Sequence, residues 1–270
     1  MATKKPTGYR EFELDLNRVI TERLPLEFDK VSRALLHPQR VQSLPEDVQG
    51  VYTLFHKGKA VYVGKTDADA GFRNRLGRHF NNISHRVGLR PRDVSFKAVR
   101  VMVFTVVNVE SALLRHYAGV HGAGSSLAWQ NLGFGSNDPG QNREGQAPAA
   151  FDVQYPVDID VPLPWVVPLA FTNLLELLLF VKSKLPYDFR FGTDLLPNGK
   201  FAHYRTGHID QRQGPVSIPA PNLTMRQLID QVMLPALPPR AWRVTLFHGR
   251  VILYPATPTP WPHTVWTKLS

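Results

Sequence analysis

The amino-acid sequence predicts an α+β fold: a small three-stranded antiparallel sheet flanked by helices, with a helical N-terminal extension and an additional small α+β region at the C-terminal end. Residues 50–64 alternate around Lys57-Gly58-Lys59 and are rich in valine, tyrosine and phenylalanine, which is typical of a β-hairpin. Residues 97–106 are rich in β-branched and apolar types and predict a third strand. The segments on both sides carry apolar residues at helical spacing.

The N-terminal 48 residues predict a loose basic tail over residues 1–8, followed by helix. Two groups of apolar residues fall at helical spacing. These are Leu16, Val19, Ile20 and Leu24, and then Val31, Leu35 and Leu36. Pro25 and Pro38 interrupt the segment, because proline breaks the helical hydrogen-bond pattern.

The region after the hairpin predicts two further helices. A loop with the capping candidates Asp67 and Asp69 leads into a helix over residues 71–83. Asn108 is the predicted cap of a second helix, which follows the third strand. The segment 122–148 is rich in glycine, asparagine and proline and is long for a structureless connection, which favours a functional loop.

Four prolines between residues 156 and 168 predict a domain boundary. The predicted organisation is therefore an extension over residues 1–48, a central domain over 49–155 and a C-terminal region over 165–270. The elements predicted for that last region are a buried helix over 169–184, a strand over 188–191, a helix capped by Asn222 or Thr224 and running to 233, and a hairpin of strands 243–247 and 251–254. Residues 193–222 predict mostly loop.

The charge of the chain favours a polyanionic partner. The 270 residues carry a net charge of +10 and a calculated pI of about 9.9, which favours nucleic acid over membrane. A solubilising surface is the alternative. The charge concentrates in residues 71–100, where Asp93 is the only acid. The basic residues there are Arg73, Arg75, Arg78, Arg86, Arg90, Arg92, Lys97 and Arg100, spaced for phosphate contacts.

Two features limit the class of protein. There are no cysteines, which excludes disulfides, thiolate zinc sites and a cysteine nucleophile. The N-terminus does not resemble a secretory signal, and the longest apolar stretch, residues 165–181, is too short and too interrupted to span a bilayer. The sequence therefore predicts a cytoplasmic protein without a membrane partner.

A series of short motifs carries the strongest functional signal. Gly50-Val51-Tyr52 and Tyr62-Val63-Gly64 lie on the two strands of the hairpin. They are followed, in order, by Lys65, Arg75, His79, Glu110 and Asn131. This series, over residues 48–140, resembles the GIY-YIG nuclease superfamily, with valine in place of isoleucine in both triplets. The Arg-x-x-x-His spacing and the Trp-x-Asn before a Gly-Phe-Gly loop resemble its type II restriction endonuclease branch.

The chemistry of phosphodiester hydrolysis agrees with these residue types. It needs an activated water, charge neutralisation at the phosphorus and stabilisation of the leaving oxygen. Glu110 would hold one Mg²⁺, which Mn²⁺ could replace, because magnesium binds one or two carboxylates plus waters. The alternative for Glu110 is a first-turn glutamate stabilised by the helix dipole.

The resemblance implies that one tyrosine activates the water and the other orients it. A tyrosine has an ordinary pKa of about 10 and is a poor base unless tuned, and the cations Lys65 and Arg75 would lower that pKa. We favour Tyr52 as the base, assisted by His79, and Tyr62 as the orienting group. The alternative is a pair of strand tyrosines that pack on a helix.

The remaining candidate residues of the site could form hydrogen bonds or ion pairs with the phosphate. Arg75 would donate two hydrogen bonds to the scissile phosphate, which suits its planar fork. His79 could be a base, a phosphate ligand or a surface histidine, and Lys65 could pair with phosphate or simply end the hairpin. Asn131 could hydrogen-bond within the site or satisfy its own backbone. The predicted nucleic-acid contacts are Arg73, Arg78, Arg86, Arg90 and Arg92.

The resulting prediction is a magnesium-dependent DNA endonuclease of the restriction type that leaves 5′-phosphate and 3′-hydroxyl ends. Double-stranded DNA is the expected partner, with a homodimer, formed at the latest on DNA, to cut both strands of a palindrome. A companion DNA methyltransferase is implied. Three alternatives stay open: a structure-directed nuclease of repair or phage defence, a catalytically silent DNA-binding module, and a protein-binding role for the C-terminal region.

Overall fold

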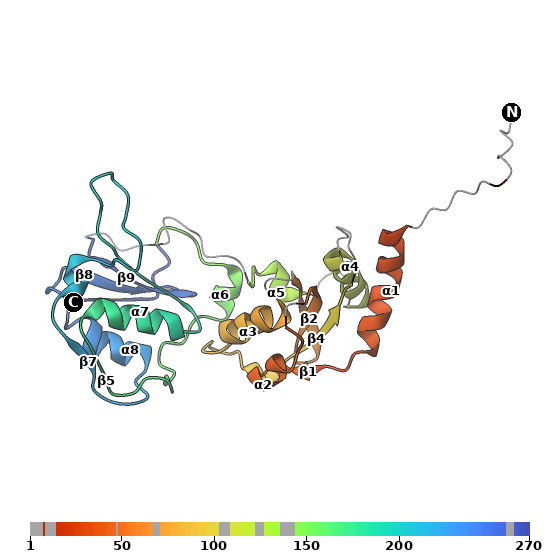
Figure 1. The fold of residues 1–270 in the computed structure, drawn as a ribbon, viewed down its shortest axis with the longest axis horizontal. Helices are drawn as coiled ribbons and strands as arrows, with labels where there is room; N and C mark the ends of the chain where they lie inside the picture. The colour runs from red at the N-terminus through yellow and green to blue at the C-terminus, as the bar shows by residue number, and fades with distance from the viewer. Residues whose placement is uncertain are drawn as a thin grey trace. The chain divides into compact units, whose positions relative to one another are not determined.

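The chain divides into two compact units, one with residues 1–75 and 94–128, the other with residues 76–93 and 129–270. The computed structural model describes residues 8, 15–46, 48–66, 71–102, 109–121, 127–135, 144–257 and 262–270. Each unit combines helices with a β-sheet (Figure 1). The predicted α+β class is therefore confirmed. The proline-rich residues 156–168, where the sequence predicts a boundary, lie inside the second unit.

The sheet of the first unit has four strands, where three were predicted. They are β1 (Ala34–Leu35), β2 (Gly50–His56), β3 (Lys59–Thr66) and β4 (Val94–Arg100). Their order is β1-β4-β2-β3, and every pair is antiparallel. The added strand is the two-residue β1. The predicted third strand starts earlier, at Val94, and ends at Arg100, while residues 103–106 of that prediction lie outside the described residues.

The β2–β3 hairpin follows from its turn. His56 pairs with Lys59, so only Lys57 and Gly58 connect the strands. Both have positive φ angles, 48° and 84°, which is the geometry that matches the twist of a two-residue hairpin. The turn therefore fixes the register, which sets Tyr52 opposite Gly64 and Leu54 opposite Tyr62.

Two helices, α1 (Leu16–Lys30) and α4 (Val109–His121), cover one face of this sheet. Because alternate residues of a strand point to opposite faces, Val51, Phe55 and Val63 turn toward these helices and away from the tyrosines. The buried cluster between them consists of Leu24, Phe28, Val51, Phe55, Ala60, Val63, Leu113, Tyr117 and Leu127. The ring of Tyr117 meets that of Phe55 edge-on at 5.8 Å.

Pro25 does not interrupt the N-terminal helix, contrary to the prediction. It lies inside α1, between Leu24 and Phe28, both buried in the core. A proline inside a helix costs about 3 kcal/mol, and burial of two large side chains is of comparable size. Pro38 does mark a boundary, since it stands in the first turn of α2 (Pro38–Gln42).

The helix α3 (Gly71–Ile83) has the predicted bounds, and a short helix η1 (Pro91–Asp93) precedes β4. The limit between the two units falls inside α3, after Arg75. The predicted caps Asp67, Asp69 and Asn108 lie outside the described residues.

The second unit is built on a sheet of order β10-β8-β9-β6. Its strands are β6 (Asp188–Phe191), β8 (Trp242–Leu246), β9 (Arg250–Pro255) and β10 (Trp266–Leu269). β6 and β9 are parallel, and the other pairs are antiparallel. The helices are α5 (Ala128–Asn131), of which Ala128 belongs to the first unit, α6 (Ala150–Gln154), α7 (Leu174–Lys184), η2 (Ile209–Arg212), α8 (Met225–Leu228) and η3 (Ile229–Met233). None of the helices in the described ranges is long and apolar enough to cross a bilayer.

The predicted helix over residues 169–184 is shorter than expected. Its first residues form β5 (Leu169–Phe171), which pairs with β7 (Val216–Ile218). Asn173 then caps α7, because its side chain accepts a hydrogen bond from the backbone of Glu176. The strand at 188–191 and the hairpin of β8 and β9 are confirmed. Of the two predicted caps of the next helix, Thr224 is the one that α8 uses.

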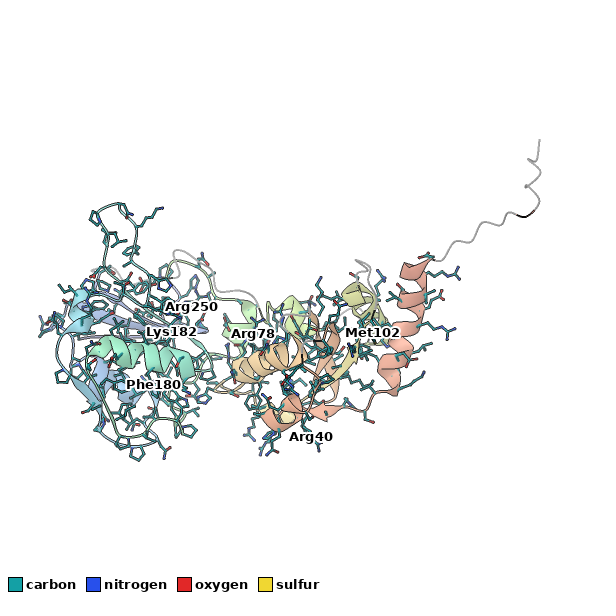
Figure 2. All side chains as sticks on the ribbon, viewed as in Figure 1. Arg40, Arg78, Met102, Phe180, Lys182 and Arg250 are labelled. Carbon is teal, nitrogen blue, oxygen red and sulfur yellow. The ribbon has the colours of Figure 1, made fainter. Side chains whose placement is uncertain are left out.

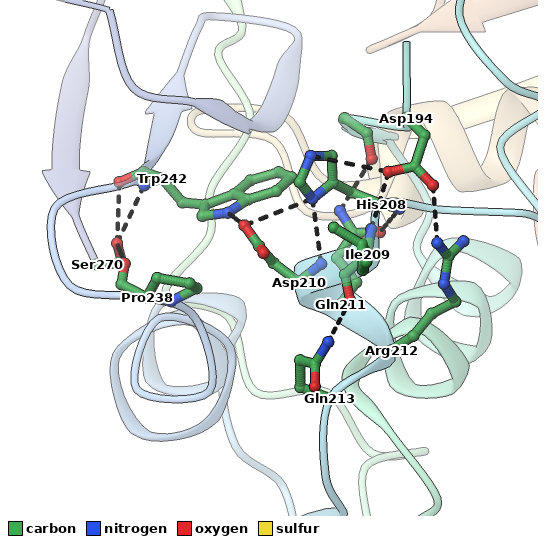
Figure 3. Close-up of polar contacts among 11 residues, drawn as sticks. Asp194, His208, Ile209, Asp210, Gln211, Arg212, Gln213, Pro238, Trp242 and Ser270 are labelled. Carbon is green, nitrogen blue, oxygen red and sulfur yellow. Dashed lines mark hydrogen bonds and ion pairs between the residues drawn. The ribbon is translucent and has the colours of Figure 1, made fainter. Parts of the chain in front are cut away.

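A polar network fixes the loop that joins β6 to η2 (Figure 3). Asp194 accepts hydrogen bonds from the backbone of Ile209 (2.9 Å) and from Arg212 (2.8 Å). Arg212 also donates to the carbonyl of Thr206 (2.7 Å), and Gln211, which is fully buried, donates to the carbonyl of Gly192 (2.9 Å). Both ends of the loop are therefore tied to the same short helix.

Asp194 makes this network sensitive to acid. The pKa of Asp194 lies below the ordinary value, mainly because the backbone of Ile209 donates a hydrogen bond to the carboxylate. Burial opposes this shift, and Arg212 lowers the pKa further. A lowered carboxyl pKa contributes stability above the unfolded value of about 3.9, and this contribution is lost as pH falls through the folded pKa. Asp194→Asn should therefore lower the free energy of unfolding at pH 7, and its difference from the unchanged protein should shrink below about pH 4. Urea titrations across this pH range would measure the free energy of unfolding of both proteins. A difference between them that does not change with pH would contradict a lowered pKa of Asp194.

Candidate active site

The two motif tyrosines lie side by side on the face of the first sheet that is opposite to α1 and α4. Tyr52 faces Gly64, and Tyr62 faces Leu54, in the antiparallel register. The ring centroids of Tyr52 and Tyr62 are 6.2 Å apart, with the planes inclined by 37°. Tyr52 is 1% exposed, and Tyr62 is half-buried. The hairpin therefore places the two tyrosines side by side, as the sequence predicts, with Tyr52 buried and Tyr62 partly accessible.

Both triplets require glycine, because neighbouring groups lie too close to the backbone at Gly50 and Gly64 to leave room for a Cβ atom. A Cβ at Gly64 would collide with the hydroxyl oxygen and Cζ of Tyr52, so the tyrosine ring lies directly over that glycine. A Cβ at Gly50 would collide with the carbonyl of Val99 and with the ring of Phe72. Since Phe72 belongs to α3, this helix packs on the tyrosine face.

Arg75 follows Phe72 by three positions on α3 and so shares its side of the helix. Its side chain is half-buried. The Nε atom is buried, and no part of the described chain accepts a hydrogen bond from it. A buried donor without an acceptor is rare in proteins and is often explained by a missing ligand or ion. Arg75 could satisfy this donor with an anionic oxygen.

Lys65 does not lie on the tyrosine face. It pairs with Val51, and residues directly opposite in an antiparallel pair point to the same side. Its exposed side chain is therefore on the side of α1 and α4. The spacing of three from Tyr62 could have shown this in the sequence, because an odd spacing on a strand changes the face. Tuning of the tyrosine pKa by Lys65 is thus not supported by the register.

Glu110 lies in the first turn of α4 and is half-buried. It precedes Leu113 and Tyr117 at helical spacing and extends their side of the helix by one turn. Within the described residues, no group of three or more histidine, aspartate or glutamate side chains could hold a metal. A magnesium ion at Glu110 would have one protein carboxylate and water as ligands, which is a donor set that Mg²⁺ accepts. This donor set fits Mg²⁺, but the side of α4 that carries Glu110 packs on the sheet face opposite to the tyrosines, as for Lys65, so the described residues do not bring Glu110 to the tyrosine face.

His79 belongs to the second unit, where it is 3% exposed. Its ring stacks on Phe134 with 4.9 Å between centroids and 29° between planes. Phe134, itself 5% exposed, belongs to an aromatic cluster with Trp129 and Phe151. The Gly-Phe-Gly loop thus buries its aromatic ring against His79, a contact that the sequence does not predict. Asn131 is exposed at the end of α5.

The five predicted nucleic-acid contacts fall into two groups. Arg78, Arg90 and Arg92 are exposed. Arg73 donates to the carbonyl of Leu44 and pairs with Glu46. The side chain of Arg86 is 7% exposed. It pairs with Asp152 at 2.6 Å and donates a hydrogen bond to the carbonyl of Tyr155. These bonds hold segments of the fold together, so the first group is the better candidate for phosphate contacts.

The second unit also contains a cavity of about 650 Å³ that adjoins α3. Four cations line it: Arg78 of α3, Lys182 of α7 and Arg250 of β9, all labelled in Figure 2, and Arg86, which pairs with Asp152 of the same lining. Asp188 is the other acid of the lining, so the cations are in excess. Lys182 was missed in the sequence, because it ends the apolar run of a buried helix. The cavity could receive an anionic group.

Two further groups lie in or beside this cavity without adding charge at neutral pH. Tyr187 lines it, is 8% exposed, and has a pKa raised by burial, with Asp158 and Asp160 adding to the shift. The pKa of His85, which lies 6.3 Å from the Tyr187 ring, is lowered by burial against the attraction of Asp158. The phenol stays protonated and the imidazole neutral at pH 7.

No family model matches the chain, and no curated protein matches it by sequence.

Proposed function

We propose that the protein is a magnesium-dependent DNA endonuclease, of the type II restriction kind, that hydrolyses phosphodiester bonds in a specific double-stranded sequence. The tyrosine face of the first unit carries the proposal: two adjacent phenols, and Arg75 on the helix that packs there, with a buried Nε that lacks an acceptor in the described chain. A phosphate oxygen would satisfy that donor. The resemblance to the GIY-YIG superfamily points to the same residues.

Each residue then has a chemical role. Tyr52, as its phenolate, takes a proton from the attacking water, and Tyr62 holds that water by a hydrogen bond. The proton reaches the leaving 3′ oxygen through solvent. Arg75 donates to the scissile phosphate, where its delocalised charge neutralises developing negative charge. The resemblance also implies a proton-transfer role for His79 and a hydrogen-bonding role for Asn131, both of which belong to the second unit. In-line attack of water leaves a 5′-phosphate and a 3′-hydroxyl.

Glu110 would hold the magnesium ion. When bound, this ion supplies charge neutralisation for the phosphate and its leaving oxygen. Lys65, on the other side of the sheet from the tyrosines, keeps in this proposal only a role toward the DNA backbone.

The surface chemistry supports DNA as the substrate. The net charge is +10, and the exposed cations Arg78, Arg90 and Arg92 are joined by Lys182 and Arg250 of the cavity. Backbone contacts of this kind give affinity without sequence preference. A restriction enzyme with one site per chain would act as a homodimer, formed at the latest on a palindromic site, with a companion methyltransferase protecting host DNA.

A cutting assay on a panel of plasmid and phage DNAs, with magnesium or with EDTA, tests this function. We expect discrete, reproducible bands with magnesium only, whose ends ligate without further treatment because they keep the 5′-phosphate. Cutting of branched DNA alone would instead indicate a structure-directed nuclease. Salt-sensitive binding with no cutting of any DNA would indicate a catalytically silent DNA-binding module, and either outcome would overturn the restriction assignment.

A further inference from the structure

A hairpin loop, formed by residues 194–202 and called the ribbon below, projects from the second unit between β6 and η2 (Figure 1), and its two arms meet in a single β-bridge. The backbone of Ala202 donates to the carbonyl of Asp194, and that of Leu196 to the carbonyl of Lys200, both at 2.8 Å. Leu195 pairs with Phe201 across the ribbon. A tight turn closes the tip, where Gly199, with a φ of 75°, donates to Leu196 at 2.9 Å.

The ribbon exposes an apolar pair. Every residue from 195 to 201 is exposed, and Leu195 and Phe201 are 64% and 75% exposed. As direct partners in an antiparallel pair they point to the same side. Contiguous exposed apolar surface is unfavourable in water and marks an interaction site when it is held in place.

The base of the ribbon is held in place. The network of Asp194, Arg212 and Gln211 ties both ends of the loop to η2 (Figure 3). Trp242, on β8, donates to Asp210 of the same helix at 2.9 Å, which joins η2 to the sheet. Both ends of the ribbon are therefore fixed, which lowers the ordering entropy that binding through it would cost.

The charge around the ribbon favours a polyanion. Residues 195–207 contain Lys200 and Arg205 and no acidic residue. A second cavity, of about 560 Å³, is lined by Phe201 and Tyr204 and also by Lys182, which borders the basic cavity of about 650 Å³ as well. The Nζ atom of Lys182 lies 5.7 Å from the centroid of the Tyr204 ring. Lys182 thus borders both cavities, and the second is also lined by Arg190 and Glu144, so its charge is mixed with a cationic excess.

We propose that the ribbon enters the major groove of duplex DNA and determines the sequence that is recognised. The major groove is wide enough to admit two chain segments side by side, and apolar side chains can contact the methyl group of thymine there. Leu195 and Phe201 would make such base contacts, and Lys200 would contact the backbone. The inference rests on the proposed endonuclease function for the reaction, but DNA binding by the ribbon is measurable without cutting.

Cross-linking tests the contact directly. A photoreactive phenylalanine analogue at position 201 is expected to cross-link to the bases of a duplex, in the absence of magnesium, in competition with unlabelled duplex. The same analogue at Phe171, in β5 of the same unit, is the control and should not cross-link. Absence of a DNA cross-link from position 201 under conditions where the protein binds the duplex would overturn the proposal and leave a protein partner as the occupant.

Three substitutions in the ribbon, compared with two control substitutions elsewhere in the same unit, test its role in recognition. Phe201→Ala and Leu195→Ala should lower cutting at the recognised site about tenfold or more, the size of one lost base contact, while Leu169→Ala, 43% exposed on β5, should not. Lys200→Ala should reduce the salt dependence of binding more than Lys184→Ala, an exposed lysine at the end of α7. Thermal melting would verify that each variant is folded.

The outcomes separate the two proposals. If the protein cuts DNA and Phe201→Ala leaves its bands and rates unchanged, the ribbon proposal is wrong and the endonuclease stands. If no DNA is cut but position 201 cross-links to bases, the ribbon contacts DNA as proposed and the endonuclease is the part that fails.

Discussion

Replacing Gly64 with alanine is expected to reduce DNA cutting by at least about a hundredfold, the contribution of a positioned general base. The new methyl group would occupy the place of the Tyr52 hydroxyl and Cζ. Tyr52 is 1% exposed, so its ring can yield only by disturbing its neighbours, and overpacking of this kind costs about 1–3 kcal/mol. Cutting under single-turnover conditions and urea unfolding would measure the two effects.

Gly77 provides the matched control. It lies on α3, and apart from its own turns of the helix no atom of the described residues is within 4 Å of the place of an added Cβ. Gly77→Ala should cut DNA at the unchanged rate. Its free energy of unfolding should rise by up to about 1 kcal/mol, because alanine is the better helix former. A double-mutant cycle adds a stricter test: the destabilisation by Gly64→Ala should be smaller in a Tyr52→Phe background, where the hydroxyl is gone. Equal destabilisation in both backgrounds would contradict the contact.

Arg75→Lys is expected to lower the cutting rate by about 10²–10³, with DNA binding nearly unchanged. The substitution keeps the charge but replaces a planar fork by a point charge, and loss of one preorganised donor to a transition state has an effect of this size. The rate with bound DNA and the dissociation constant without magnesium would be measured separately.

Arg78→Lys is the control on the same helix. Arg78 is exposed, and a backbone phosphate contact tolerates lysine, so rate and affinity should both change little. If Arg75→Lys cuts as fast as the unchanged protein, the buried Nε does not serve the reaction, and Arg75 is only a structural residue of α3.

Local signals explain what the sequence could predict about the fold. The Lys57-Gly58 turn and the alternation around it determine both the hairpin and its register. The bounds of α3 were predicted correctly because apolar residues at helical spacing fill that segment. From the register alone, Tyr52 and Tyr62 must share a face, and the structure places their rings 6.2 Å apart.

Long-range pairing explains what it could not predict. Residues 169–171 form a strand only because Val216–Ile218 lies beside them, and the apolar pattern of the segment is equally compatible with a helix. Pro25 is tolerated inside α1 because Leu24 and Phe28 are buried by partners from other elements. The ribbon over residues 194–202 depends on Arg212 and Gln211, which no local pattern connects to it.

The candidate site shows the same division. The series of motifs singled out the two tyrosines, Arg75 and Glu110. The structure places the tyrosines and α3 on one face of the sheet and α4 on the other. The stacking of His79 on Phe134, and the bonds that engage Arg73 and Arg86, depend on partners brought close by folding. Lys65 is the exception, since its position opposite Val51 follows from counting residues along the strand.

The proposed site requires Glu110 for the hydrolysis of DNA but not for the binding of DNA. We would measure single-turnover cutting by the unchanged protein and by Glu110→Gln, both at saturating enzyme on the same DNA with magnesium. Retained binding with cutting lowered by at least about a hundredfold is the expected result, because the amide keeps the shape of the carboxylate but binds magnesium poorly. Equal cutting by both proteins would contradict the proposed site.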